Sequence, residues 1–178
     1  MPDGGPHGPR RPEQYHVVSL VLRTSRRFPS LATVTAIQES MQVLLIEDNP
    51  GDVELLRLGF EESFEPARHL RFDVRCDGRA GMTALCDAAQ CATSPYQLIV
   101  LDLNLPVRSG FELLAFIKQH ERLRNVPTVV LTSSDRPAER SRARALDADG
   151  YFLKPATFSG YVALVGSLGQ YLVPNARR

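Results

Sequence analysis

A short apolar run at residues 97–105, QLIVLDLNL, restricts the fold of this chain more than any other stretch. Residues 98–101 are all aliphatic, and Pro95 and Pro106 stand on either side of the run. Apolar runs of about four to eight residues between turn signals are typical of strands buried on both faces, as in a parallel sheet. The carboxylate of Asp102 then lies at the carboxyl end of this strand, the edge at which open parallel sheets bind ligands.

From residue 41 onward, segments of strand character alternate with segments of helix character. Expected strand–helix pairs cover residues 42–46 and 52–62, 72–75 and 79–91, 97–103 and 111–123, 126–131 and 135–146, and 150–153 and 157–172. Short strands that alternate with helices of this length indicate βαβ units. The predicted fold is therefore an α/β fold of (βα)5 type, a doubly wound five-stranded parallel sheet with helices on both faces.

Polar side chains stand at the expected carboxyl ends of four strands: Glu47 and Asp48, Asp102, Thr132, and Lys154. Three carboxylates at one edge raise one another's pKa values unless a cation neutralises them. Oxygen ligands of this kind suit Mg²⁺. A carboxylate can attack phosphorus to give an acyl phosphate, and a metal ion, an ammonium and a hydroxyl would offset the charge on the phosphoryl oxygens. The constellation therefore predicts phosphoryl transfer onto Asp102.

Each member of this constellation has a plainer interpretation when it is considered alone. Glu47 and Asp48 could simply mark a helix N-terminus, where carboxylates are favourable in any case. A threonine at a strand end, such as Thr132, is common, and so is a Lys–Pro pair after a strand, here Lys154–Pro155. Their order, their positions at strand ends and their shared chemistry favour a common site.

Residues 42–173 resemble, from end to end, the receiver domain of two-component response regulators, which has the flavodoxin-like CheY fold. Four motifs carry the resemblance: IEDN (46–49), LDLNLP (101–106), LTSSD (131–135) and YFLKP (151–155). The resemblance implies that Asp102 accepts a phosphoryl group from the phosphohistidine of a sensor histidine kinase. It also implies a signalling protein and not an enzyme, with no more than Mg²⁺-dependent self-phosphorylation from phosphodonors and autodephosphorylation.

The resemblance extends to the individual residues of a metal site. It implies that Asp48, Asp102 and the backbone carbonyl of Asn104 bind Mg²⁺ directly. Glu47 would contribute through a bound water. Mg²⁺ is therefore the one cofactor that we expect.

The resemblance also assigns roles around the phosphoryl group. Thr132 and Lys154 would contact its oxygens, and the peptide bond between Lys154 and Pro155 would be cis. Tyr151, three residues before Lys154, matches the switch aromatic of the family. This ring would turn inward when Thr132 is drawn toward the phosphate.

Within the receiver family, EDNPGDVELL (47–56) and LDLNLPVRSG (101–110) look like the stand-alone branch paired with bacterial phytochromes and related hybrid kinases. The resemblance implies a phytochrome-type kinase as partner, and a relay to a histidine phosphotransfer protein stays open. Because the chain ends soon after the last expected helix, we expect no DNA-binding domain and an output through protein contacts. A phosphate-independent scaffold is the alternative, although such scaffolds usually lose the phosphoacceptor, the acidic pair or the lysine.

Two other classes of protein fit the sequence less well. A phosphatase of the haloacid dehalogenase type also uses an aspartate at a strand end, but it needs a second aspartate two residues later, where this chain has Asn104. A dinucleotide-binding domain needs a G-x-G-x-x-G turn after the first strand. Residues 47–51 of this chain read EDNPG instead.

The composition is that of a globular protein, with 43% hydrophobic and 23% charged residues among 178. A net charge of +1 gives no support for binding to nucleic acid or membrane. No run approaches the roughly 20 apolar residues that span a bilayer. Cys76, Cys86 and Cys91 have no metal-ligand spacing, and their odd number argues against a disulfide framework. We therefore expect a cytoplasmic protein with reduced cysteines and no membrane association.

Residues 1–40 differ from the remainder of the chain. They open with MPDGGPHGPRRPEQ, which is rich in Pro, Gly and Arg and has too few apolar residues for a core. Met41 stands directly before the first strand. We expect a disordered extension over residues 1–40 and a receiver domain over residues 41–178. The extension is either an artefact of the gene model, with Met41 as the true start, or a targeting or partner-binding tail.

The last expected helix has no charged residue, because none occurs between Lys154 and Arg177. A helix packed on a sheet normally turns a charged face to water. We expect the core-facing stripe to consist of Phe158, Tyr161, Val162, Val165, Leu168 and Leu172. Leu164 and Tyr171 are then left towards solvent, together with Ser167, Gln170, Gly160, Gly166 and Gly169. An uncharged outer face with aromatic and small residues indicates a protein interface. We therefore predict a homodimer through this helix, to which helix 135–146 and strand 150–153 contribute.

Overall fold

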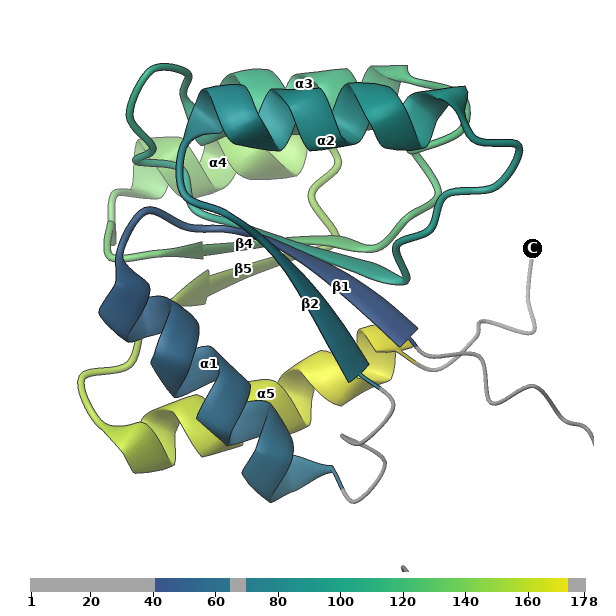
Figure 1. The fold of residues 1–178 in the computed structure, drawn as a ribbon. Helices are drawn as coiled ribbons and strands as arrows, with labels where there is room; N and C mark the ends of the chain where they lie inside the picture. Colours follow the sequence, from purple (N-terminus) through teal and green to yellow (C-terminus); the bar gives the residue numbers. More distant parts are fainter. Residues whose placement is uncertain (1–40, 65–69, 173–178) are drawn as a thin grey trace, which may run out of the picture. The chain divides into compact units, whose positions relative to one another are not determined.

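The computed structural model describes residues 41–64 and 70–172. The expected extension, residues 1–40, lies outside the described residues, so its disorder stays a prediction. In the described part, five strands and five helices alternate along the chain (Figure 1). They are β1 Met41–Ile46, α1 Pro50–Ser63, β2 Leu70–Arg75, α2 Gly78–Gln90, β3 Leu98–Leu101, α3 Gly110–Gln119, β4 Thr128–Thr132, α4 Pro137–Ala145, β5 Gly150–Leu153 and α5 Phe158–Leu172.

The strands form one parallel sheet in the order β2-β1-β3-β4-β5. The chain therefore moves outward from β1 to β2, returns past β1 to β3, and continues to β4 and β5. This order confirms the predicted doubly wound (βα)5 fold. The direction of winding reverses between β1 and β3, and open α/β sheets bind ligands outside the carboxyl ends of the strands at such a reversal.

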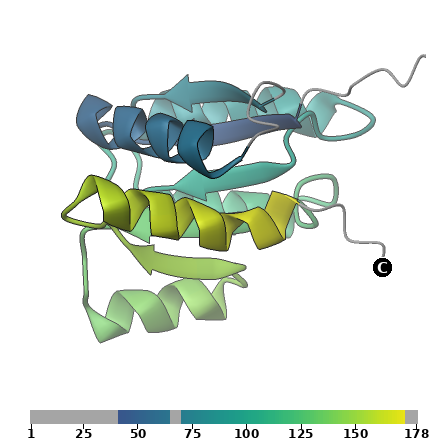
Figure 2. The same ribbon diagram turned by 90° about the horizontal axis from the view of Figure 1, so that it is seen from below.

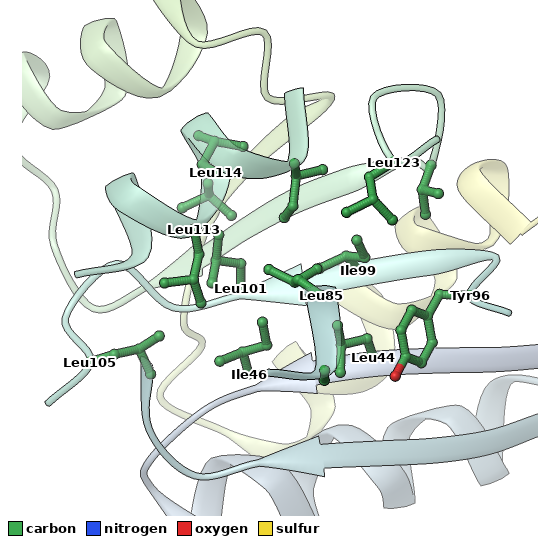
Figure 3. Close-up of a cluster of buried hydrophobic side chains, with 14 of the residues drawn as sticks. Leu44, Ile46, Leu85, Tyr96, Ile99, Leu101, Leu105, Leu113, Leu114 and Leu123 are labelled. Carbon is green, nitrogen blue, oxygen red and sulfur yellow. The ribbon is translucent and has the colours of Figure 1, made fainter. Parts of the chain in front are cut away.

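Side chains of the central strands alternate between two apolar layers, because successive residues of a strand point to opposite faces. Leu44 and Ile46 of β1 belong to the layer covered by α2, α3 and α4, which Figure 3 shows in close-up. Val43 and Leu45 belong to the layer covered by α1 and α5. Figure 1 shows these two groups of helices on opposite sides of the sheet. Strand β3 is buried along its whole length, as predicted for residues 98–101.

Helix α3 ends at Gln119, earlier than the predicted residue 123. His120 closes the helix, since its N–H donates to the carbonyl of Ile117, and turns follow. Leu123 is fully buried from within these turns, so its apolar character extends the helical pattern beyond the actual end. Pro127 also disfavours helical conformation in the residue before it. The other predicted bounds agree with the structure to within two residues.

Helix α5 buries most of the predicted stripe, namely Tyr161, Val165, Leu168 and Leu172, but two positions differ from the prediction. Leu164 is 8% exposed and belongs to the apolar layer beside α1, so its prediction as a solvent-facing dimer contact is wrong. Phe158, expected in the core, is 44% exposed. The actual buried stripe follows the i, i+3, i+4, i+7 spacing of one helix face. Its first turns contribute Tyr161, Leu164, Val165 and Leu168.

The outer face of α5 is uncharged and includes small residues, as predicted. Tyr171 is only partly exposed, because its hydroxyl donates a 3.0 Å hydrogen bond to the carbonyl of Asp149. The exposed positions after the first turn are Ala163, Gly166, Ser167 and Gln170. Among the described residues, no helix has the length and apolar character that a membrane span requires.

Candidate functional site

The polar residues predicted from the strand ends meet at the carboxyl edge of the sheet. Backbone hydrogen bonds continue the ladders past the strands: the Asp102 N–H donates to the Ile46 carbonyl at 3.0 Å, and the Lys154 N–H donates to the Thr132 carbonyl at 2.9 Å. Glu47, Asp102 and Thr132 are all buried, although their side chains are polar. Strand pairing therefore fixes the backbone positions of these residues at the carboxyl edge of the sheet.

The ammonium of Lys154 lies at the centre of the site. Its Nζ is 2.7 Å from Asp102 Oδ2, 2.7 Å from Glu47 Oε2 and 2.9 Å from Asp52 Oδ2. An ammonium has three N–H donors, so it can give one to each carboxylate. Three negative charges nevertheless face one positive charge, and a further cation would neutralise the excess.

Burial and hydrogen bonding act in opposite directions on the pKa values of this cluster. Burial raises the pKa of Glu47, and hydrogen bonds from Lys154 and from the Asn49 N–H only partly offset this effect. Burial alone would lower the pKa of Lys154, but its hydrogen bonds to Asp102, Glu47 and Asp52 outweigh burial and raise the pKa above its ordinary value. Lys154 is therefore an ammonium at neutral pH and can neutralise charge on a group attached to Asp102.

Three carboxylates of the site could hold a metal ion. Oxygen atoms of Glu47, Asp48 and Asp102 lie within 4.8 Å of one another. Glu47 and Asp102 are buried, whereas Asp48 is exposed, so the cluster can be reached from solvent. Mg²⁺ prefers oxygen ligands, uses few protein carboxylates and keeps several waters. The residues present therefore fit the predicted Mg²⁺.

Asn104 lies directly beside Asp102. Its backbone N–H donates to Asp102 Oδ1 at 3.1 Å, and its side-chain amide donates to Thr132 Oγ1 at 3.3 Å. Asn104 therefore ties the loop after β3 to the end of β4. Its role as a metal ligand through the backbone carbonyl stays a prediction, and so does the contact of Thr132 with a phosphoryl group.

Tyr151 is connected to Thr132 through Ser134. The Ser134 N–H donates to Thr132 Oγ1 at 3.2 Å, and the Tyr151 hydroxyl donates to the Ser134 carbonyl at 2.9 Å. The guanidinium of Arg140 in α4 lies 4.6 Å from the centre of the Tyr151 ring. Two hydrogen bonds therefore connect Thr132 to Tyr151, and the Arg140 contact connects the Tyr151 ring to α4. The role of Tyr151 as a switch stays a prediction.

One expectation about the loop after β5 is wrong. The peptide bond between Lys154 and Pro155 is trans, as are the other peptide bonds of the described residues. The trans form is intrinsically favoured by about 0.5–1 kcal/mol even before proline. Lys154 reaches its three carboxylate partners from this trans backbone.

Sequence reasoning misses two residues of the site, Asp52 in the first turn of α1 and Tyr161 in α5. Besides its contact with Lys154, Asp52 accepts a 2.7 Å hydrogen bond from the Tyr161 hydroxyl on Oδ1. In the sequence, Asp52 reads as an acidic residue that suits a helix N-terminus, and Tyr161 reads as a core residue. One signal was present, because the first turn of a helix that follows a strand end lies at the same edge of the sheet.

The loop between β3 and α3 holds the backbone of Asp102 closely. A Cβ on Gly110 would lie 2.1 Å from the Asp102 carbonyl oxygen, so this position requires glycine. Earlier in the loop, Val107 has φ 70°, and the Arg108 N–H donates to the Pro106 carbonyl at 2.8 Å. This geometry is a γ-turn, which is rare and strained.

Comparisons with known proteins agree with this geometry. The family model described as the response regulator receiver domain matches residues 43–165. The chain is 32% identical over 143 residues to the probable methanogenesis regulatory protein FilR2 of Methanothrix harundinacea, covering 78% of this chain and 87% of FilR2. It is 32% identical over 130 residues to the response regulator Rcp1 of Synechocystis sp., covering 72% and 86%. Some relatives are longer, and the chain spans 52% of the transcriptional regulatory protein QseB of Haemophilus influenzae.

Solved structures show the same similarity. The Mn²⁺-bound form of Rcp1 superposes with a TM-score of 0.64 at 29% identity, covering 77% of this chain and 97% of that one. The phosphorylated cyanobacterial phytochrome response regulator RcpA superposes with a TM-score of 0.64 at 30% identity, covering 77% and 96%. From the matched residues and the fold, the chain belongs to the family of response regulator receiver domains.

Proposed function

We propose that this protein is a response regulator that accepts a phosphoryl group on Asp102 from a histidine kinase in a Mg²⁺-dependent reaction. One observation carries the proposal: Asp102 Oδ2 lies 2.7 Å from Lys154 Nζ within a partly buried acidic cluster at the winding reversal. Membership of the receiver family supports it, and the similar protein RcpA has been crystallised in a phosphorylated form.

The residues of the site suit transfer from a phosphohistidine. A carboxylate oxygen of Asp102 attacks phosphorus and forms a P–O bond. The P–N bond to the kinase imidazole breaks, and the imidazole nitrogen keeps the electron pair and takes up a proton from water. Lys154 can turn one N–H from Asp102 to a phosphoryl oxygen, and the Thr132 hydroxyl can bind another. Mg²⁺, held by Asp48 and Asp102 with Glu47 nearby, would supply positive charge against the acceptor and the phosphoryl oxygens.

Intact-mass spectrometry after incubation with acetyl phosphate and Mg²⁺ tests the proposal. The wild type should gain one phosphoryl group, and EDTA should abolish the gain. Asp102→Asn, which keeps the shape of the side chain but removes the nucleophile, should gain none. No gain in the wild type, with acetyl phosphate or with a phosphorylated histidine kinase as donor, would favour the phosphate-independent scaffold.

Thermal unfolding with and without Mg²⁺ tests the metal site separately. Mg²⁺ should stabilise the wild type by about 2.7 kcal/mol at roughly 100 times its dissociation constant, since only the folded state holds the ligands together. Asp48→Asn should lose most of this stabilisation. An equal increase of melting temperature in both proteins would contradict a site that includes Asp48.

The kinase partner and the setting belong to the same proposal. Similarity to Rcp1 and to the phytochrome response regulator RcpA supports a phytochrome-type kinase, and a histidine phosphotransfer protein is a further candidate for phosphoryl exchange. We propose residues 41–178 as the receiver domain, which contains the matched residues 43–165. Cys76, Cys86 and Cys91 are exposed free thiols, which suits the reducing cytoplasm.

We also propose a homodimer through α4, β5 and the outer face of α5. The uncharged outer face of α5 supports it, together with Leu153 at the end of β5 and Phe158 at the start of α5, which are 41% and 44% exposed. Leu164 takes no part, because it is buried within the chain. Sedimentation of the wild type and Phe158→Ser over a micromolar dilution series tests the proposal. The variant should dissociate at higher concentration, and a wild type that is monomeric throughout would contradict the dimer.

A further inference from the structure

A line of three hydrogen-bonded side chains leads from the site into the packing between two helices. Lys154 Nζ lies 2.9 Å from Asp52 Oδ2, and the Tyr161 hydroxyl donates to Asp52 Oδ1 at 2.7 Å. Tyr161 is only 1% exposed. Asp52 is therefore held on both of its oxygens, by the site on one side and by α5 on the other.

Helices α1 and α5 approach each other closely along this line. They lie side by side on one face of the sheet in Figures 1 and 2. A Cβ on Gly59 of α1 would lie 3.1 Å from Val165 Cγ2 and 3.3 Å from the Tyr161 carbonyl oxygen. The backbone of Tyr161 is thus packed against α1, so its hydroxyl is held in reach of Asp52.

We infer that Asp52, fixed by the Tyr161 hydroxyl, is a positioning residue that orients the Lys154 ammonium toward the phosphoryl group on Asp102. The three N–H groups of Lys154 have three carboxylate partners. On phosphorylation, the N–H that points at Asp102 turns to a phosphoryl oxygen, while Glu47 and Asp52 keep the other two. This inference rests on the proposed function, since it concerns the rate at which Asp102 is phosphorylated.

A purely electrostatic role of Asp52 would change the rate in the opposite direction. Its negative charge repels an anionic phosphodonor, so removal of the charge alone would speed phosphorylation. Removal of a hydrogen bond that positions Lys154 slows phosphorylation, because the ammonium then spends less time directed at the phosphoryl oxygens. The sign of the change in rate therefore distinguishes the two roles.

The initial rate of phosphorylation by acetyl phosphate at saturating Mg²⁺ provides the first test. Asp52→Asn should be about tenfold slower, as expected for loss of a charge-assisted hydrogen bond. Tyr161→Phe should be roughly threefold slower, since it loses a bond to the positioning residue alone. The double variant should be no slower than Asp52→Asn, because Tyr161 acts through Asp52. Glu54→Gln, which removes an exposed charge from α1, is the matched control and should have the wild-type rate.

The side-chain nitrogen resonances of lysine provide a second test that needs neither metal nor phosphodonor. The chain has only two lysines, Lys118 and Lys154, so ¹⁵N-lysine labelling gives two ammonium signals. Asp52→Asn should shift or broaden the Lys154 signal and leave that of Lys118 unchanged. Asp149→Asn should do the reverse, because Asp149 is the partner of Lys118. A merely structural role of Asp52 would not single out Lys154.

Three outcomes would overturn the inference. The first is a phosphorylation rate of Asp52→Asn that equals or exceeds the wild-type rate. Because the wild type is still phosphorylated in that case, the proposed function stays intact. The second is a Lys154 signal that Asp52→Asn does not change. The third is a wild type that takes up no phosphoryl group while the Lys154 signal responds as expected, and this result also overturns the proposed function. Equal melting temperatures of wild type and Tyr161→Phe would show that a slower rate does not reflect unfolding.

Discussion

The two lysines of this chain lie at opposite edges of the sheet, and their surroundings differ in charge balance. Lys154 follows β5 at the carboxyl edge and contacts three carboxylates. Lys118 of α3 contacts one, Asp149, which directly precedes β5 at the amino edge. Asp149 also accepts the N–H of Thr128 at 2.8 Å, and Lys118 also donates to the Arg124 carbonyl. Both lysine side chains are 10% exposed, so burial does not distinguish them.

Charge balance separates a structural ion pair from a site. At the amino edge, one positive charge meets one negative charge, and backbone groups complete the hydrogen bonds. At the carboxyl edge, surplus carboxylates are buried together, which lowers the stability of the folded state. Buried clusters of ionisable groups are found mainly at functional sites. The surplus negative charge therefore indicates the edge at which a cation and a phosphoryl group are expected to bind.

Replacement of each lysine by methionine should give the largest difference between the two edges. Lys154→Met leaves Glu47 and Asp102 buried without a counter-ion, so we expect a loss of about 3 kcal/mol in the free energy of unfolding without Mg²⁺. Its phosphorylation should fall by roughly 100-fold or more. Lys118→Met should lose about 1 kcal/mol or less, because Asp149 remains partly solvated, and it should keep the wild-type rate. Urea unfolding and phosphorylation kinetics measure both effects, and equal losses would contradict the comparison.

Replacement of one aspartate at each edge should change stability in opposite directions. Asp102→Asn removes a surplus negative charge, so without Mg²⁺ we expect its free energy of unfolding to increase by about 1 kcal/mol. Substitutions that abolish function at a strained site often stabilise a protein. Asp149→Asn breaks a balanced pair and should lose about 1 kcal/mol. Denaturant unfolding measures both. A loss of stability in Asp102→Asn would show that its carboxylate is a net stabilising partner of Lys154.

The pH dependence of stability should reveal the buried Glu47. Its pKa in the folded protein is raised from the ordinary value of 4.5, mainly by burial. The folded state therefore holds this proton more firmly, and the stabilisation present below pH 4.5 is lost as pH rises through the raised pKa. The stability of Glu47→Gln relative to the wild type should accordingly increase with pH across this window. Urea unfolding at a series of pH values measures the trend, and a relative stability that falls with pH would contradict it.

The smallest effects should come from the two residues with positive φ among the described residues, one at each edge. Val107 has φ 70° and is β-branched, so this conformation is strained. Val107→Gly should therefore increase the free energy of unfolding by about 0.5–1 kcal/mol, despite the entropy cost of glycine. Asp147 has φ 58° at the residue after the C-cap of α4, where the Ala148 N–H bonds the Ala143 carbonyl at 3.1 Å. Aspartate tolerates this conformation, so Asp147→Gly should gain less, about 0.5 kcal/mol or less. A larger gain at Asp147, in parallel thermal melts, would contradict this order.

The proximity of Asp102 and Lys154 was predictable from sequence, because the parallel sheet places both residues at the same edge. Asp102 and Lys154 follow short buried strands, and the carboxyl ends of parallel strands meet at one edge. Asp52 was not predictable to the same degree, because its role depends on where Tyr161 of α5 packs against α1. That contact joins residues far apart in the chain, and no local pattern records it.

The fold was predictable at the level of elements and less so in the rotation of α5. Val162 and Leu164 are both apolar, and they flank the buried stripe of this helix on opposite sides, because residues two apart are about 200° apart around the axis. Contact with the apolar layer on this face of the sheet determines which of them is covered, and Leu164 is the more deeply buried. The pattern of apolar residues alone does not contain this contact. The charge-free character of the helix and the exposure of Ser167 and Gln170 were therefore predicted correctly, whereas the exposure of Leu164 was not.

The most direct test of the central claim locates the phosphoryl group among the four acidic residues of the site. Borohydride converts an aspartyl phosphate to homoserine, and peptide sequencing by tandem mass spectrometry then identifies the position. After reaction with acetyl phosphate and Mg²⁺, we expect homoserine at position 102 alone. Reduction at Glu47, Asp48 or Asp52, or a phosphorylated protein without any product at position 102, would contradict the assignment of Asp102 as the phosphoacceptor.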